Sequence, residues 1–95
     1  MITQEELKEL LDYNPETGLF TWNVYNNIKN KTTAGTFNDG YIQIKIKQKI
    51  YQAHRLAWLY VYGEWPKGQI DHINGIRDDN RIENLRDVTN RETLS

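Results

Sequence analysis

The sequence lacks cysteine altogether, and none of its apolar runs approaches the roughly 20 residues that cross a bilayer. The first absence excludes disulfide bridges and thiolate zinc sites, and it is compatible with a reducing compartment. The second excludes a membrane-spanning helix, and the first residues do not have the pattern of a signal peptide. We therefore expect a soluble, intracellular protein without a membrane partner.

An excess of positive charge is also absent, because the formal net charge of the 95 residues is −1. The charges are unevenly distributed. Residues 1–18 hold five acidic residues and one lysine, residues 19–67 hold seven basic and two acidic residues, and residues 68–95 hold four basic and six acidic residues. A basic middle region supports DNA binding only weakly, since such a region is about as often a solvated face. A bound divalent cation would offset the acidic C-terminal region.

A chain of this length predicts one domain with a small core, and its patterns predict the α+β class. Thr3 and Glu6 form a capping box for a first helix, which should end near Asp12. Residues 19–23 then read as a short strand, and residues 25–32 as an exposed loop. We expect an N-terminal helix followed by an antiparallel meander in the first half of the chain.

The clearest strand signal is residues 41–47, where isoleucine occupies every second position. A brief strand at 35–37 should precede it, and the chain should reverse near Gln48 and return over residues 50–53. A ribbon of this kind can lie in a DNA groove or along phosphates, and lysines on an edge can equally serve only to prevent aggregation. Three lysines are placed on or beside this hairpin, namely Lys45, Lys47 and Lys49.

Residues 54–63 read as a buried helix that ends at Gly63. They are apolar nearly all round, so this helix should form the centre of the core. Its aromatic side chains are better explained by packing than by base stacking.

The chemically richest stretch begins with Asp71 and His72, followed at once by the strong turn pair Asn74 and Gly75. A carboxylate is a ligand for a hard metal ion, and an imidazole can act as a base near neutral pH. Neighbours on a regular strand point to opposite faces, so both side chains can serve one site only where the strand ends or bulges. The turn pair lies where that break is needed.

The sequence DHINGIRDDNRIENL, residues 71–85, resembles the HNH (ββα-metal) endonucleases, in particular the small phage and intron-homing type. The resemblance extends over residues 53–92 and includes His54, Arg55 and Leu56. The phrase NPETGLFTW at residues 14–22 also looks like the front of phage proteins of this group. The resemblance implies a C-terminal ββα-metal motif in residues 53–95, behind an N-terminal helix and meander in residues 1–52, all within one domain of residues 1–95.

The same resemblance implies a reaction and its residues. Asp71 would bind one divalent metal ion, Mg²⁺ or Mn²⁺, and His72 would be the general base that deprotonates water. Asn84 would brace the loop and orient the base. The products of DNA cleavage, most simply a nick in double-stranded DNA, would carry a 5′-phosphate and a 3′-hydroxyl.

Further residues receive supporting roles. Asn80 is expected to stabilise the loop, and His54 is expected to be structural, although it could contact a phosphate. Arg55 and Arg86 are candidates for phosphate contacts, with Arg86 the better placed because its strand must border the metal site. Asp78 and Asp79 are more readily explained as solvated loop residues than as ligands.

The sequence departs from the family at the last metal ligand, which is usually a His or an Asn about one turn into a helix starting here at Thr89. That position holds Thr93, whose hydroxyl is a poorer ligand, and Asn90 could substitute only if the helix shifted. A helix running from Thr89 to Ser95 would be under two turns long and marginal by itself.

Two functions therefore remain in view. The first is a metal-dependent nuclease of phage or mobile-element type in the bacterial or infected cytoplasm, with specificity from a homodimer or a partner protein. The second is a DNA-binding module of the same fold, impaired naturally or by an engineered change. A purely structural protein is a third, weaker reading, because it would not require a base beside a ligand.

Overall fold

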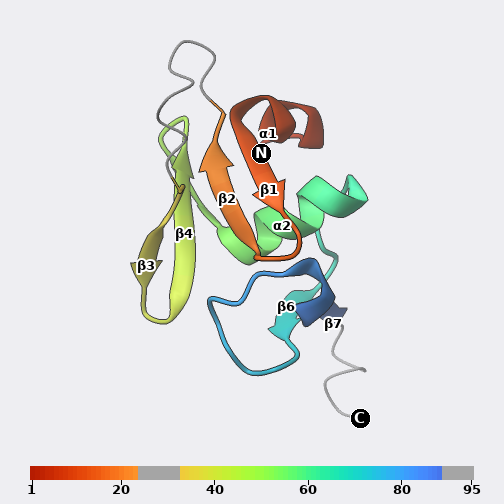
Figure 1. Cartoon of the computed structure of the whole chain (residues 1–95). Helices are drawn as coiled ribbons and strands as arrows, with labels where there is room; N and C mark the ends of the chain where they lie inside the picture. Colours follow the sequence, from red (N-terminus) through yellow and green to blue (C-terminus); the bar gives the residue numbers. More distant parts are fainter. Residues whose placement is uncertain (24–32, 89–95) are drawn as a thin grey trace.

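Three small antiparallel sheets are arranged around helix α2 in the computed structural model, which describes residues 1–23 and 33–88 (Figure 1). The fold is α+β, as predicted. Its helical elements are α1 (Gln4–Leu10), α2 (Ala53–Tyr62) and the 3₁₀ turn η2 (Ile82–Asn84). Its sheets are β1 (Leu11–Asn14) with β2 (Leu19–Trp22), then β3 (Thr36–Asn38), β4 (Tyr41–Ile46) and β5 (Lys49–Gln52), then β6 (Gln69–His72) with β7 (Leu85–Val88).

Helix α1 begins as its capping box predicts, because the Thr3 hydroxyl accepts a hydrogen bond of 3.2 Å from the Glu6 amide. It ends earlier than expected, and the backbone is already extended at Leu11. The chain passes directly into β1, a strand that the sequence did not predict. Leu11 and Tyr13 are buried there while Asp12 and Asn14 are not, which is the alternation of a strand with one covered face.

The predicted meander is confined to β3, β4 and β5, while β1 and β2 form a sheet of their own. The tight reversal between β4 and β5 lies one residue earlier than expected, because β4 ends at Ile46 and β5 begins at Lys49. Lys47 and Gln48 fill the turn with φ values of 49° and 69°. Positive φ at both central residues is what a two-residue hairpin of matching twist requires.

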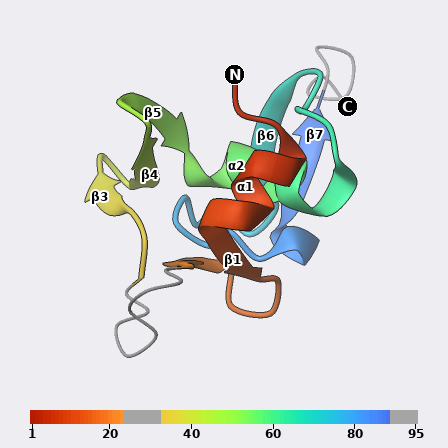
Figure 2. The ribbon, with the colours of Figure 1, turned by 90° about the horizontal axis from the view of Figure 1, so that it is seen from above.

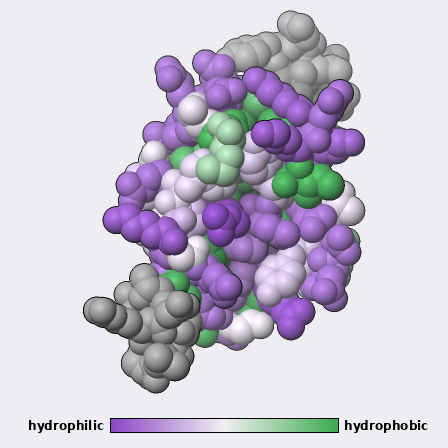
Figure 3. All heavy atoms as spheres, turned by 180° about the vertical axis from the view of Figure 1, so that it is seen from behind, coloured by the Kyte–Doolittle hydropathy of each residue, from purple (hydrophilic) through white to green (hydrophobic). Residues whose placement is uncertain are grey.

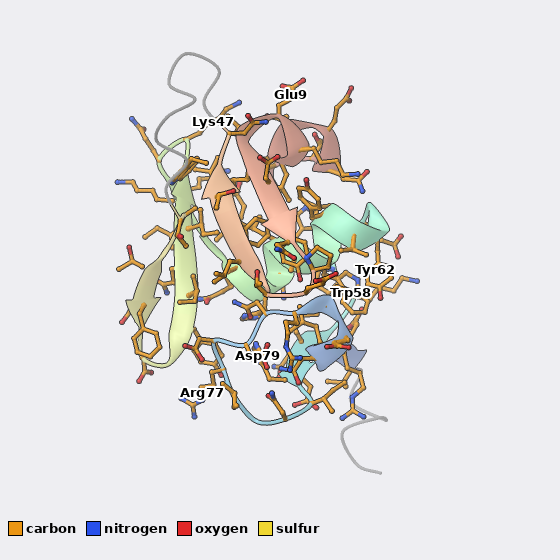
Figure 4. The ribbon with its side chains drawn as sticks, in the orientation of Figure 1. Glu9, Lys47, Trp58, Tyr62, Arg77 and Asp79 are labelled. Atoms are coloured by element: carbon orange, nitrogen blue, oxygen red, sulfur yellow. The ribbon has the colours of Figure 1, made fainter. Side chains whose placement is uncertain are left out.

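Helix α2 supplies the centre of the core but is covered on one side only. Its buried residues are Ala53, Leu56, Ala57 and Leu59. Its last turn is open to solvent, with Val61 40% and Tyr62 55% exposed, which corrects the expectation of burial all round. The Tyr62 ring instead packs on Trp58, at 4.4 Å between centroids (Figure 4). Gly63 ends the helix in the left-handed region at φ 81°, as predicted.

The view from above shows the β3–β5 sheet on one side of α2 and the β6–β7 pair on the other (Figure 2). The tip of the β1–β2 hairpin reaches the loop between β6 and β7. A Cβ atom on Gly18 would lie 2.4 Å from the carbonyl carbon of Asn80 and from the Arg81 nitrogen, so only glycine allows this approach. In the described part of the chain, no helix has the length and apolarity needed to span a membrane.

Candidate functional site

Strand β6 ends where the sequence predicted a break. The Gly75 amide donates to the His72 carbonyl at 2.8 Å, and Gly75 adopts φ 78°. The Ile73 amide donates to the Asn84 carbonyl at 2.8 Å. The Asp71 side chain is 43% exposed, whereas His72 is only 9% exposed, so the carboxylate faces solvent and the imidazole is buried.

Asn84 joins the two ends of the β6–β7 loop. Its amide oxygen accepts from the Asn74 backbone at 2.9 Å, and its amide nitrogen donates to the Asp79 carbonyl at 2.9 Å. The residue is buried, at 4% exposure. The structure thus places Asn84 as a brace of the loop, while its two side-chain hydrogen bonds go to backbone and not to the imidazole.

The hydrogen bond on the imidazole comes from Asn80 instead. The amide Oδ1 of Asn80 lies 3.0 Å from Nε2 of His72, and Asn80 is 2% exposed. With the amide oxygen facing the ring, Nε2 carries the proton and Nδ1 is left as the basic nitrogen. Asn80, which the sequence placed among loop-stabilising residues, is therefore the direct partner of the candidate base.

Asn80 is held in turn from the N-terminal hairpin, in a way that sequence analysis did not detect. The Tyr13 hydroxyl donates to the Asn80 carbonyl, and Gly18 packs against the same peptide unit. Burial and then the charge of Asp79 raise the pKa of Tyr13, which keeps its hydroxyl protonated as a donor. The family-like phrase at residues 14–22 was the available signal, since it contains Gly18.

His54, in the first turn of α2, packs against His72 at the end of β6. The two imidazole centroids are 5.2 Å apart in an edge-to-face arrangement, and the Tyr41 ring lies 5.7 Å from His54 and 6.1 Å from His72. Burial, then the nearby His72 and Arg55, lower the pKa of His54 from 6.5 to about 4. His54 is therefore a neutral aromatic neighbour of the candidate base at physiological pH.

The predicted metal ligand has a partner in this structure. Asp71 and Arg86 are opposite each other in the β6–β7 register, and Arg86 Nη2 donates to Asp71 Oδ2 at 2.7 Å. Their side chains are 43% and 57% exposed, so solvent weakens the pair. A metal ion or a DNA phosphate can therefore compete for either member at modest cost.

Asp79 belongs to the scaffold of the loop. Its Oδ2 accepts from Arg81 Nη2 at 2.8 Å and from the Asn74 side-chain Nδ2 at 2.7 Å, and its Oδ1 accepts from Arg81 Nε at 2.8 Å. The Arg81 contacts hold the pKa of the Asp79 carboxyl well below the ordinary range. These hydrogen bonds occupy the oxygens that a metal ion would need. The expectation that Asp79 is a solvated loop residue is therefore wrong, because its side chain is only 16% exposed and is paired with Arg81.

The donor chemistry of the site suits a hard divalent cation only in part. Asp71 provides a solvent-facing carboxylate oxygen, which Mg²⁺ and Mn²⁺ accept as a ligand. No group of three or more His, Asp or Glu side chains suited to a metal ion occurs among residues 1–23 and 33–88. Thr93 and Asn90, the candidates for the remaining ligand, and the helix expected from Thr89 lie outside the described residues, as does the predicted loop at 25–32.

The three lysines proposed for DNA contact do not form one group, although Lys47 and Lys49 line a common pocket beside Glu6. Lys45 is exposed on β4, but Lys47 sits in the hairpin turn and donates to Glu6 at 3.1 Å, beside α1 (Figure 4). Lys49 is paired in register with the buried Ile46 and therefore points to that face of the sheet. The expectation that Lys45 and Lys47 share one polar face is wrong, because β4 stops one residue before Lys47.

Arg55, at the start of α2, is closer to the candidate site because it lines a pocket with His54. The view from behind shows a mostly hydrophilic surface with scattered apolar residues (Figure 3). Hydrophilicity alone does not mark a DNA-binding face, so the position of Arg86 beside Asp71 and that of Arg55 beside His54 carry more weight.

Comparison with known proteins adds a family to this geometry. No curated protein and no solved structure matches the chain. Residues 51–94 match the family described as HNH endonuclease, and the matched region contains Asp71, His72, Asn80 and Asn84. On the match and on the strand–loop–strand site that it covers, we assign this region of the chain to the HNH endonuclease family.

Proposed function

We propose that the chain is a metal-dependent DNA endonuclease that hydrolyses phosphodiester bonds with His72 as its general base. The observation that carries the proposal is the buried imidazole whose Nε2 lies 3.0 Å from Asn80 Oδ1 at the end of β6, next to the exposed carboxylate of Asp71. The family assignment indicates nuclease activity in general and implies DNA as the substrate and a divalent metal ion as the usual cofactor.

The residues perform separable tasks in this mechanism. His72 Nδ1 accepts the proton of a water molecule as that water attacks the phosphorus, and Asn80 keeps the opposite nitrogen protonated. Asp71 would hold the metal ion, which when bound would supply positive charge to stabilise the phosphate and the leaving 3′ oxygen. Asn84 maintains the loop that carries Asn80. The products are a 5′-phosphate and a 3′-hydroxyl.

Arg86 has two uses on this proposal. Its guanidinium pairs with Asp71 in the free protein and can turn to a DNA phosphate when the carboxylate binds a cation. One site per chain favours nicking by a monomer, whereas a dimer would cut both strands. We place the protein in the cytoplasm of a bacterium, with phages or mobile elements as its source.

A second candidate, DNA binding without cleavage, is favoured by a specific pair of observations. Thr93 stands where the family usually offers its last ligand, and the one carboxylate available on β6 is engaged by Arg86. A protein with this arrangement would keep the fold and the DNA affinity while holding metal weakly.

The test is a supercoiled-plasmid assay with Mg²⁺ or Mn²⁺, with EDTA as the control for metal dependence. We expect nicking that requires metal and falls at least about a hundredfold in His72→Ala, the usual lower range for loss of a general base. Asp71→Asn should lose metal binding by calorimetry, while a gel shift should show that both variants still bind DNA.

The outcomes separate the two candidates. Equal nicking by His72→Ala would remove His72 as the base. A shifted but uncut plasmid would favour the binding protein, and Thr93→Asn would then be compared with the parent chain. Gain of nicking in Thr93→Asn would identify the missing ligand as the cause.

A further inference from the structure

A pocket of about 260 Å³ opens between β4, β5, the start of α2 and the start of β6. It is lined by Tyr41, Gln52, His54, Arg55, Gln69 and Ile70. Neither the family assignment nor the proposed mechanism gives it a role. Its volume far exceeds the roughly 10–15 Å³ that one ordered water molecule needs.

The pocket adjoins the candidate base. Two of its lining rings, His54 and Tyr41, lie 5.2 and 6.1 Å from the His72 imidazole by ring centroids. Gln69 and Ile70 precede Asp71 on the same strand. A nucleotide whose phosphate is attacked at His72 would therefore bring a neighbouring sugar or base to this pocket.

The lining is chemically suited to a polar, uncharged, planar group. Among the described residues, the lining contains two side-chain amides, one phenol ring and one imidazole, with Arg55 as the single cation. Amide side chains read the edges of bases, and aromatic rings accept base planes by stacking. A phosphate would be better served by several cations, which the lining does not provide.

Two polar atoms in the pocket walls lack partners among the described residues. Gln52 Oε1 and His54 Nδ1 are both buried without a hydrogen bond. A buried acceptor without a donor costs free energy, so a ligand that brings a donor is favoured once the Gln52 amide rotates toward it. Exocyclic amino groups of bases are such donors, and glutamine pairs with N6 and N7 of adenine in particular.

We propose that this pocket receives the edge of one DNA base next to the scissile phosphate, and that Gln52 selects a base with an exocyclic amino group, adenine before thymine. This inference rests on the proposed function in taking DNA as the ligand. It adds a position of sequence preference within the nuclease domain itself. Thymine is disfavoured because its exposed edge offers O4 and a methyl group in place of the amino donor.

The test measures binding separately from cleavage. A pool of DNA duplexes with a randomised centre is bound by the full chain in EDTA, and the bound fraction is sequenced. We expect one position at which adenine exceeds thymine about tenfold, the discrimination typical of one side-chain amide on a base. Gln52→Leu should bring this ratio close to one while total DNA affinity changes less than about threefold.

Gln43→Leu is the matched control, because Gln43 lies directly opposite Gln52 in the β4–β5 register but does not line the pocket. It should retain the adenine preference. Gln69→Leu changes an exposed position of the pocket lining and should weaken the adenine preference. It provides a second test of the pocket if the Gln52→Leu protein does not fold. Circular dichroism would confirm that all three variants fold.

The results also distinguish this inference from the proposed function. A preference for adenine in EDTA, without nicking when metal is added, would support base binding in the pocket and would contradict the proposed endonuclease activity. Nicking without any base preference near the cut would overturn the proposal that the pocket binds a base. An equal loss of adenine preference in Gln43→Leu and Gln52→Leu would overturn it as well. If the chain binds no DNA in EDTA, the inference is overturned and the pocket holds water only.

Discussion

At the scale of single residues, two buried asparagines of one loop carry different tasks. Asn84 bonds to backbone at both ends of the loop, whereas Asn80 bonds to the imidazole of His72. Removing the first should disturb folding of the loop, and removing the second should disturb the base. The sequence analysis assigned orientation of the base to Asn84 and loop stabilisation to Asn80, whereas in the structure it is Asn80 that contacts the imidazole.

Asn80→Ala should lower kcat for nicking by about ten- to a hundredfold, the usual effect of losing a residue that orients a reactive ligand. KM should change little, because Asn80 is 2% exposed and does not reach the DNA. Leaving Nε2 of His72 without its acceptor should also cost about 1–3 kcal/mol of unfolding free energy. Single-turnover nicking and urea unfolding measure the two effects.

Asn84→Ala is the matched control for this prediction. It should increase hydrogen exchange at the Asn74 amide, whose acceptor is the Asn84 side chain, whereas Asn80→Ala should leave that amide protected. If Asn80→Ala cleaves as fast as the parent chain, Asn80 has no role in orienting His72.

At the scale of elements, the β1–β2 hairpin supports the candidate site although it lies outside the matched residues 51–94. Tyr13 on β1 and Gly18 at the hairpin tip both meet the peptide unit of Asn80. The hairpin thereby determines where Asn80 stands relative to His72. Residues 51–94 alone would lack this support.

Gly18→Ala should reduce the nicking rate at least tenfold, because its Cβ would lie 2.4 Å from backbone atoms and must push the Asn80 segment away. Tyr13→Phe should have a smaller effect, about 1 kcal/mol of stability, since it removes one hydrogen bond and keeps the ring packed on Phe20. Leu19→Ala, at a 49% exposed position of the same hairpin, is the control and should be near neutral. Nicking by Gly18→Ala at the parental rate would show that Asn80 does not depend on the hairpin.

At the scale of the whole molecule, the sequence predicted elements and turns that depend on neighbouring residues, and it missed contacts between segments that are distant in the chain. The isoleucine alternation gave β4, Gly63 gave the end of α2, and Asn74 with Gly75 gave the break after His72. Strand β1 was missed because Leu11 fits a helical face and a buried strand equally well. The sequence also could not reveal which loop amide meets the imidazole, since that depends on the folded path of the chain.

The pH dependence of stability should report the burial of the His54 imidazole at the start of α2. Its folded pKa of about 4 lies below the ordinary 6.5, so between these values the unfolded chain binds a proton that the folded chain does not. Stability should therefore be complete above about pH 6.5 and fall as the pH drops toward 4, by at most on the order of 3 kcal/mol.

Urea unfolding followed by tryptophan fluorescence, at pH values from about 7.5 down to about 4.5, measures this slope. His54→Phe keeps an aromatic ring against His72 but cannot titrate, so its stability should vary less across the window. Asp79 contributes to the pH dependence of stability in a different, more acidic range. Its pKa is lowered in the fold from 3.8, so its contribution persists until the pH falls below about 4. An unchanged slope in His54→Phe would mean that His54 binds its proton equally well in the folded and unfolded chains, so that burial does not lower its pKa.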